Sequence, residues 1–146
     1  MNYSRESALD LRQFALSKKM IVGTGVDIIE VERVKKALDA WGEKFLSRVF
    51  TQRELDYVNT KKFPSENLAA RFACKESVLK AFGDTRTGIQ LRSIEVLNDE
   101  KGKPEIVLHG EAKEFAEKNS LDNIIVSMSH TANYAVSNAI LWRNDR

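Results

Sequence analysis

The stretch AARFACKESVLKAFG, residues 69–83, decides the fold of this chain. At about 100° per residue it predicts a long helix whose apolar stripe includes Phe72 and Leu79. Glu76 and Lys80 lie one turn apart at the edge of that stripe, beside small alanines. Alanines let another element approach closely, and a carboxylate in such a groove needs a cation, a hydrogen-bond donor or a metal ion. The alternative is a solvated Glu76–Lys80 pair that stabilises the helix by about 0.3 kcal/mol.

A strand is predicted in MIVGTGVDIIEV, residues 20–31, because β-branched residues alternate along it. One face carries β-branched and apolar side chains, whereas the other carries two glycines and a carboxylate, Gly23, Gly25 and Asp27. Glycines leave space over a strand for the close approach of a ligand or of another backbone. The GxG pair also occurs in dinucleotide-binding folds, but the third glycine and the opening helix of that fingerprint are missing.

Asp27 has two interpretations. It either caps the helix that begins near Glu30 or binds a metal ion, because both roles use a carboxylate at a strand-to-helix junction. If Asp27 converges with Glu76, the two carboxylates make a site typical of Mg²⁺, which binds few carboxylates together with waters and phosphate oxygens. Lys80 would then face the same phosphate. Two carboxylates, Mg²⁺ and a lysine are typical of phosphoryl transfer, because they neutralise charge that develops on phosphate oxygens.

The rest of the chain predicts an α+β domain, since strands are interspersed with helices. Thr51 and Glu54 match a capping box, and Ser65 is placed to cap the long helix. Segment 92–110 predicts a hairpin, because two alternating runs flank an Asn-Asp-Glu-Lys-Gly connection. Further helices are expected near residues 31–42 and 112–116, and two further strands around residues 130–133.

The composition is that of a globular protein with one domain. The chain has 146 residues, of which 42% are apolar, so it can bury a core. A net charge of +2 does not indicate a nucleic-acid-binding surface, and no run approaches the roughly 20 apolar residues that span a bilayer. The single cysteine, Cys74, favours a reducing compartment, so we expect a cytoplasmic protein. Residues 1–19 are expected to form a leader or accessory helix, and residues 20–146 the domain.

Four blocks, in this order, resemble the holo-acyl-carrier-protein synthases, the small bacterial class of 4'-phosphopantetheinyl transferases. The blocks are GTGVDIIEVERV (23–34), RFACKESVLKAFG (71–83), GKPEIVLHG (102–110) and VSMSHTANYAV (126–136). The resemblance implies a small antiparallel-rich sheet packed against the long helix. It also implies transfer of the phosphopantetheine arm of coenzyme A to a serine of apo acyl carrier protein in fatty acid biosynthesis, with release of adenosine 3',5'-bisphosphate.

The same resemblance implies roles for single residues. Asp27 and Glu76 match the Mg²⁺ ligands, and Lys80 matches the residue that stabilises the pyrophosphate, so Glu76 and Lys80 are the predicted catalytic residues. Residues that fall where the family contacts coenzyme A are Arg71, Lys75, His130 and Thr131. Arg33 matches the basic face that receives the acidic carrier protein. The family forms a trimer with active sites between subunits, so these residues need not meet in one chain. The connection 84–91 departs from the glycine-rich loop expected there.

Several alternatives stay open. The base that takes the serine proton is either Glu76, acting directly or through a metal-bound water, or His130. A non-catalytic module is a rival, in which Asp27 caps a helix, Glu76 pairs with Lys80 and a basic helix binds an acidic protein. Another magnesium-dependent enzyme that acts on a nucleotide phosphate is the third reading.

Overall fold

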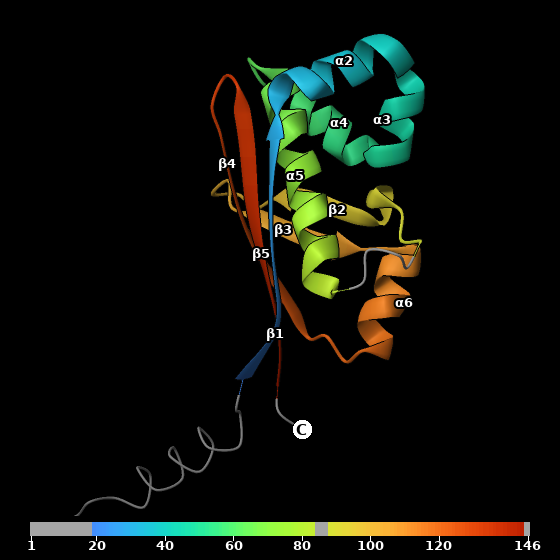
Figure 1. Cartoon of the computed structure of the whole chain (residues 1–146), viewed down its shortest axis with the longest axis vertical. Coiled ribbons are helices and arrows are strands. Elements are labelled where there is room, and N and C mark those ends of the chain that lie inside the picture. Colours follow the sequence, from blue (N-terminus) through green and yellow to red (C-terminus); the bar gives the residue numbers. More distant parts are fainter. Residues whose placement is uncertain (1–18, 84–87, 145–146) are drawn as a thin grey trace, which may run out of the picture.

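The computed structural model describes residues 19–83 and 88–144 (Figure 1). The expected leader, apart from Lys19, and residues 84–87 of the 84–91 connection lie outside this part of the chain. The elements are β1 Lys19–Glu30, α2 Val31–Trp41, α3 Glu43–Val49, α4 Gln52–Asn59, α5 Pro64–Phe82, the 3₁₀ turn η1 Leu91–Ser93, β2 Ile94–Asn98, β3 Pro104–Leu108, α6 Gly110–Lys118, β4 Asn123–His130 and β5 Tyr134–Asn144. None of the described helices is long and apolar enough to cross a bilayer.

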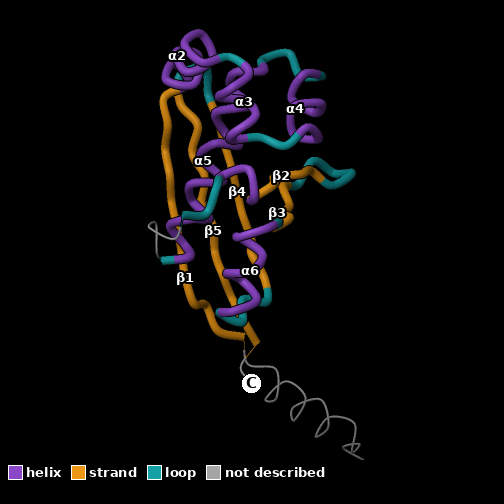
Figure 2. The backbone as a smooth tube through the Cα atoms, turned by 90° about the vertical axis from the view of Figure 1, so that its right-hand side faces the viewer, coloured by secondary structure: helices purple, strands orange, loops and turns teal. Residues whose placement is uncertain are grey.

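The fold is a small antiparallel sheet with the long helix α5 packed on one face. The strands lie in the order β1-β5-β4, and β2 and β3 form a separate antiparallel hairpin. Figure 2 shows α5 in front of the sheet, and Figure 1 shows α2 to α4 around one end of α5 and α6 towards the other. This arrangement confirms the predicted α+β class and the predicted packing of sheet against helix.

Two glycines let β1 lie directly on the backbone of α5. A Cβ atom at Gly25 would lie 1.9 Å from the carbonyl oxygen of Ser77, and one at Gly23 would lie 2.1 Å from that of Ala81. No side chain fits at either position. The space over the glycine face of the strand is therefore occupied by another backbone, which is one of the two alternatives that the sequence left open.

The core has two parts that meet along α5. The N-terminal half of the helix packs with α2, α3 and α4 through buried residues that include Leu68, Ala69 and Ala73. The C-terminal half packs with β2, β4, β5 and α6 through residues that include Cys74 and Val78. Burial raises the pKa of the Cys74 thiol to about 11, so this cysteine is an unreactive packing residue.

Two helix ends agree with the prediction from the sequence, and a third differs from it. The capping box of Thr51 and Glu54 is confirmed, with both reciprocal hydrogen bonds formed. Gly83 ends α5 in a left-handed conformation, with φ of 82°. The prediction that Ser65 caps α5 is wrong, because the helix already begins at Pro64, with Phe63 as an N-cap that makes no side-chain hydrogen bond. Proline suits the first helical position because its φ is preset and it has no N–H to satisfy.

Glu54 also forms a buried ion pair that joins α4, α5 and β2. Lys75 Nζ donates to Glu54 Oε1 at 2.7 Å and to the carbonyl oxygen of Ile94 at 2.6 Å, and both charged side chains are fully buried. Glu54 Oε2 accepts from the backbone N–H of Val96 at 3.2 Å. Burial lowers the pKa of Lys75, whereas the charge of Glu54 acts to raise it. The charge of Lys75 is therefore stable in the core only while Glu54 is there to pair with it.

We expect Glu54→Ala to destabilise the fold by about 3–5 kcal/mol, because it leaves the charge of Lys75 buried and unpaired. Urea unfolding measures this loss. The matched control is Asp56→Ala in the same helix, which removes an exposed carboxylate and should change the free energy of unfolding by less than about 0.5 kcal/mol. Equal losses in the free energy of unfolding in the two variants would show that the buried ion pair contributes no more to stability than an exposed carboxylate.

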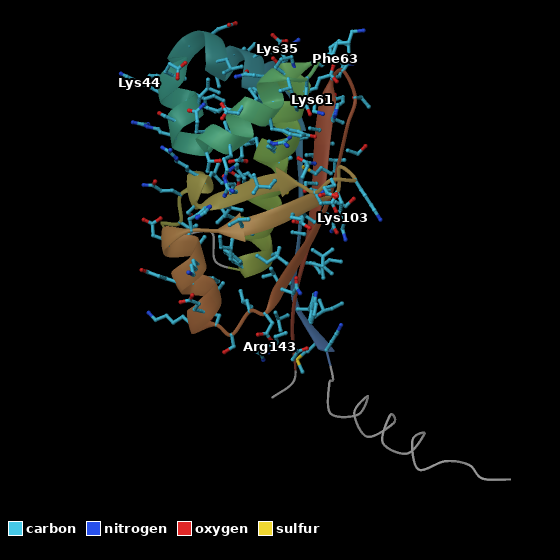
Figure 3. All side chains as sticks on the ribbon, turned by 180° about the vertical axis from the view of Figure 1, so that it is seen from behind. Lys35, Lys44, Lys61, Phe63, Lys103 and Arg143 are labelled. Atoms are coloured by element: carbon cyan, nitrogen blue, oxygen red, sulfur yellow. The ribbon has the colours of Figure 1, made fainter. Side chains whose placement is uncertain are left out.

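The face of the sheet that points away from α5 exposes large apolar side chains. Ile28 is 65% exposed, and it pairs across β1 and β5 with Val136. We call this surface the apolar sheet face, and its residues are Val22, Val26, Ile28, Ile125, Tyr134 and Val136. An exposed apolar patch that spans adjacent strands is typical of a surface that binds a partner. Figure 3 shows that Lys35, Lys44 and Lys61 lie elsewhere, at the end formed by α2 to α4.

Candidate active site

Asp27 and Glu76 come together from two different elements. Asp27 lies in β1, opposite Ser137 of β5, and Glu76 lies in α5. Both side chains line one hollow of about 360 Å³, together with Arg33, Phe45 and residues near them. The close contact of β1 with α5 fixes this arrangement, because Asp27 follows Gly25 by two residues and lies on the same face of the strand.

Lys80 binds the strand rather than its helical neighbour. Its Nζ donates to Asp27 Oδ1 at 2.9 Å and to the carbonyl oxygen of Val26 at 3.0 Å. The solvated Glu76–Lys80 pair is therefore not formed. Asp27 does not cap α2 either, since Glu30 is the N-cap of that helix and no side chain makes a capping hydrogen bond there. Neither of the purely structural roles considered for these residues, the Glu76–Lys80 pair and the helix cap of Asp27, is therefore found in the described residues. The side chain of Lys80 is 47% exposed.

Glu76 is a carboxylate without a bonded partner among the described residues. No hydrogen bond or ion pair to its side chain forms within residues 19–83 and 88–144. Burial raises the pKa of Glu76, and the nearby charge of Asp27 raises it further, whereas Lys80 lowers it. Lys80 is paired with Asp27, and the other cation at the hollow, Arg33, forms no ion pair with Glu76 in the described residues, so the carboxylate of Glu76 lacks a bonded cation there. A divalent cation would compensate that charge.

The donor set fits Mg²⁺. The described residues contain no group of three or more histidine, cysteine, aspartate or glutamate side chains of the kind that holds Zn²⁺. Mg²⁺ instead binds through one or two carboxylates and keeps its other positions for waters and substrate phosphates. Asp27 and Glu76 supply those two carboxylates, and the hollow beside them leaves room for a phosphate-bearing ligand.

The three predicted basic contacts are placed differently from one another. Arg33, on α2, lines the hollow of Asp27 and Glu76 and is exposed. Arg71 is only 1% exposed, and its guanidinium lies 4.5 Å from the ring centre of Tyr57. Lys75 is 0% exposed and bonded to Glu54. The predicted contact of Lys75 with coenzyme A does not fit this position, because its ammonium is bonded to Glu54 and to the carbonyl oxygen of Ile94 inside the core.

His130 and Thr131 lie away from the carboxylate pair. Ile29 of β1 pairs with Ala135 of β5, which pairs in turn with His130 of β4, so His130 is on the opposite edge strand from Asp27. His130 Nδ1 lies 3.1 Å from a carboxylate oxygen of Glu66. The Thr131 hydroxyl accepts hydrogen bonds from two backbone N–H groups and so forms part of the turn between β4 and β5. One protomer does not bring these residues into the hollow.

Comparison with known proteins places this geometry in a family. A sequence model of the 4'-phosphopantetheinyl transferase superfamily matches residues 23–139. The chain belongs to this superfamily. The transferase is 47% identical over 116 residues to the holo-[acyl-carrier-protein] synthase of a Thermoanaerobacter species, a match that covers 80% of this chain and 83% of that relative. It is 44% identical to the synthase of Solibacter usitatus, over 84% of this chain and 98% of the relative.

Solved structures show the same fold. The holo-[acyl-carrier-protein] synthase of Neisseria meningitidis has a TM-score of 0.77 and 29% identity, covering 84% of the transferase and 98% of that chain. The Bacillus anthracis enzyme, solved in complex with CoA (3',5'-ADP), has a TM-score of 0.69 and 35% identity, covering 85% of the transferase and 98% of that chain. The transferase therefore shares the fold of enzymes that bind coenzyme A.

Three features of the site were not predicted from the sequence. The carbonyl oxygen of Val26 helps to hold Lys80, and a backbone acceptor leaves no trace in a pattern of side chains. Phe45 of α3 reaches the hollow from a helix with no functional motif. The placement of Arg33 beside the carboxylates had a usable indication, since α2 starts directly after β1 and carries Arg33 on its first turn.

Proposed function

We propose that the transferase moves the 4'-phosphopantetheine arm of coenzyme A to a serine of apo acyl carrier protein, in a magnesium-dependent reaction that releases adenosine 3',5'-bisphosphate. We place it in the cytoplasm and in fatty acid biosynthesis. The observation that carries the proposal is the meeting of Asp27 and Glu76 in one hollow, with Lys80 bonded to Asp27. Membership of the superfamily supplies the substrate class.

In the proposed site Asp27 and Glu76 would hold Mg²⁺, and the metal ion would supply positive charge to the pyrophosphate of coenzyme A. Lys80, which is half-exposed beside Asp27, contributes a second positive charge to the same phosphates. These groups favour the departure of the bisphosphate, because charge builds up on the leaving oxygen as the serine hydroxyl attacks.

Glu76 is also the better of the two candidates for the base. Its carboxylate has no protein donor within the described residues, so it can still accept a proton or hydrogen bond from the serine hydroxyl. Asp27 is bound to Lys80, and His130 lies on the far edge strand, bonded to Glu66. A general base must come within hydrogen-bond reach of the proton it takes, and within one protomer Glu76 meets this requirement best.

The carrier protein is proposed to dock on α2. Arg33 lines the hollow and is exposed, and Lys35 and Lys36 are exposed on the same helix. Their charge complements an acidic carrier and would orient its serine towards Glu76. Arg71 keeps a predicted role in coenzyme A binding, since its buried Nε has no hydrogen-bond partner within the described residues.

We further propose a homotrimer with active sites between subunits. The apolar sheet face supports assembly, because burying it removes large apolar side chains from water. The distance between the two edge strands supports a shared site, since a neighbouring subunit can bring its own His130 and Thr131 to the hollow of Asp27 and Glu76.

We expect Ile28→Glu to dissociate the assembly, because it places a charge in the middle of the apolar sheet face. Sedimentation velocity should give a trimer for the wild-type chain and a monomer for the variant. The matched control is Glu32→Gln, an exposed change on α2, which should leave the trimer intact. A wild-type chain that sediments as a monomer at tens of micromolar concentration contradicts the proposal.

Mass spectrometry of the carrier tests the function itself. The transferase is incubated with coenzyme A, Mg²⁺ and apo acyl carrier protein, and the carrier should gain the mass of one phosphopantetheine. Replacing the acceptor serine of the carrier by alanine should abolish the gain. A carrier whose mass stays unchanged under these conditions, at all Mg²⁺ concentrations, would refute the proposed transfer.

A further inference from the structure

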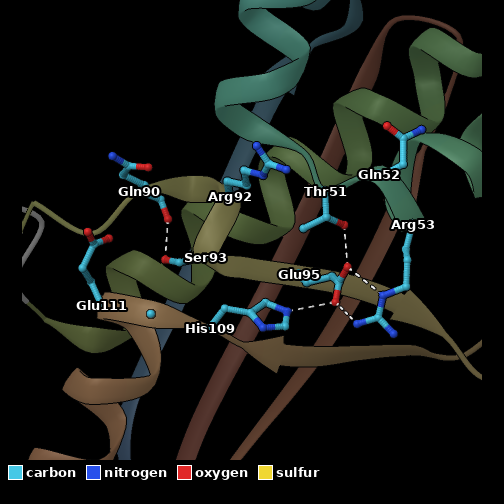
Figure 4. Close-up of a pocket in the computed structure, with 10 residues that line it drawn as sticks. Thr51, Gln52, Arg53, Gln90, Arg92, Ser93, Glu95, His109 and Glu111 are labelled. Carbon is cyan, nitrogen blue, oxygen red and sulfur yellow. Dashed lines mark hydrogen bonds and ion pairs between the residues drawn. The ribbon is translucent and has the colours of Figure 1, made fainter.

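A second hollow lies on a different part of the molecule. Its volume is about 480 Å³, and it shares no lining residue with the hollow of Asp27 and Glu76. The walls come from α4, η1, β2 and the start of α6. Figure 4 shows Thr51, Arg53 and His109 arranged around Glu95 in this hollow.

Glu95 organises one wall of the hollow. The residue is 1% exposed, and its carboxylate accepts hydrogen bonds from Thr51 Oγ1, from Arg53 Nη2 and, at 3.2 Å, from Arg53 Nε. His109 Nε2 lies 3.0 Å from the same carboxylate. Burial raises the pKa of Glu95, but the hydrogen bonds from Thr51, His109 and Arg53 together bring it below its usual value. The ionised carboxylate thus has its acceptor sites filled, and it holds Arg53 and His109 in fixed positions.

Donors are left over on the open side of this wall. Arg53 uses Nε and Nη2 on Glu95, so Nη1 has no partner within the described residues. Arg92 spends Nη1 on the carbonyl oxygen of Ser47 at 3.1 Å, which leaves its other nitrogens unbonded in the described part of the chain. His109 Nδ1 is likewise unbonded there, and it is a donor in the imidazolium form, in which Nε2–H donates to Glu95. Arg53 and Arg92 therefore border the hollow with unbonded donors, and His109 adds a third as the imidazolium.

Two carboxylates line the hollow. Glu95 is saturated, and the other lining carboxylate is that of Glu111, which is exposed and which Figure 4 shows on the opposite side from Arg53. Since Arg53 neutralises Glu95, the cation of Arg92 faces the hollow without a bonded carboxylate in the described residues. A ligand that fits such walls brings acceptor oxygens and negative charge.

We propose that this hollow binds the phosphate group of a small molecule. A phosphate offers oxygens in several directions, which suits donors that come from three elements, whereas a carboxylate offers two oxygens in one plane. The ion pair with Glu95 fixes the guanidinium of Arg53 and leaves its Nη1 for a ligand, whereas Arg92 keeps Nε and Nη2 unbonded in the described residues and can offer them to a phosphate as a fork. The site is separate from the proposed transfer reaction and does not depend on it.

Titration with inorganic phosphate, followed by ¹⁵N NMR of the full chain, tests the site. The buffer contains no Mg²⁺ or coenzyme A, and sodium chloride keeps the ionic strength constant. We expect saturable shifts of the amide signals of Arg53, Arg92 and Gly110. Arg92→Gln and His109→Gln should each weaken binding by roughly tenfold or more, because each removes a donor to the anion. The control Lys113→Gln removes an exposed cation of α6 that lies outside the hollow and should leave the affinity unchanged.

Two further arms separate the possible sources and sites of binding. Lys80→Gln should retain the shifts at Arg53 and Arg92, which distinguishes this hollow from the proposed coenzyme A site. Glycerol 3-phosphate represents soluble ligands, and phosphatidic acid in phosphatidylcholine vesicles represents lipid headgroups. Binding of either that Arg92→Gln weakens supports the site and identifies the source. Shifts confined to residues around Lys80, or equal phosphate affinity in the wild type and in both Arg92→Gln and His109→Gln, overturn the proposal.

Discussion

Glu76→Gln should lower kcat/KM for transfer to the carrier by at least about 10²–10³-fold, the range seen when one group that stabilises developing charge is removed. Glutamine keeps the size of the side chain but removes the negative charge that the metal ion requires. The fold should not suffer, because the pKa of Glu76 is raised by burial, which shows that the charged form is held at a cost in stability. Steady-state transfer and urea unfolding are measured on the same preparation.

The matched control for this variant is Glu114→Gln, the same chemical change at an exposed position of α6. Its transfer activity and its stability should both equal those of the wild type. Loss of activity in Glu76→Gln together with loss of stability would point to a structural role for the carboxylate. Full activity in Glu76→Gln would remove it from the reaction.

Gly25→Ala should have the largest effect on stability, a loss of more than about 4 kcal/mol that leaves little folded protein. The added methyl group would lie 1.9 Å from the carbonyl oxygen of Ser77 and 2.7 Å from the backbone nitrogen of Ala81. Both atoms belong to the backbone of α5, so no side chain can rotate away and the strand must separate from the helix. Circular dichroism and urea unfolding report the outcome.

Thr24→Ala is the comparison for Gly25→Ala. Thr24 is the preceding residue of β1, and it is exposed on the far face of the sheet, so its truncation should cost much less than the glycine change. A Gly25→Ala chain that unfolds at the wild-type urea concentration would show that β1 and α5 are not in the close contact described here.

The architecture could be predicted because local patterns and global packing agree. The helical spacing around Phe72 and the alternation around Val26 identify α5 and β1, and the glycines of that strand mark the face that approaches another element. Those features left the meeting of Asp27 with Glu76 as a condition, and the resemblance to the family implied it. What the glycines approach was not decided by the sequence, because a ligand and a helix backbone require the same absence of a Cβ atom.

The pairing of charges was harder to predict than the elements. The i, i+4 spacing favours a Glu76–Lys80 pair, but the strand offers Lys80 a carboxylate and a carbonyl oxygen at once. Glu54 was recognised as a cap, whereas its second bond to Lys75 depends on a residue 21 positions away. Spacing along a helix identifies possible partners within that helix. A residue binds a partner from another element instead when that partner offers more hydrogen bonds.

Resemblance to a family locates motifs but not their exposure. Lys75 stands beside Glu76 in the motif, yet one residue along a helix turns the side chain by about 100°, from the hollow into the core. His130 belongs to another motif and reaches the site only if a neighbouring subunit supplies it, which the sequence of one chain does not encode as a contact.

Direct measurement of the metal site tests the central claim, that Asp27 and Glu76 together hold a divalent cation. Electron paramagnetic resonance of Mn²⁺, which substitutes for Mg²⁺ at oxygen ligands, is recorded during titration of the chain in the presence of coenzyme A. A protein-free control measures the Mn²⁺ that coenzyme A binds by itself. We predict one further Mn²⁺ bound per chain in the wild type and no such further binding in the Asp27→Asn/Glu76→Gln double variant. Equal Mn²⁺ stoichiometry and affinity in the wild type and the double variant would contradict the account.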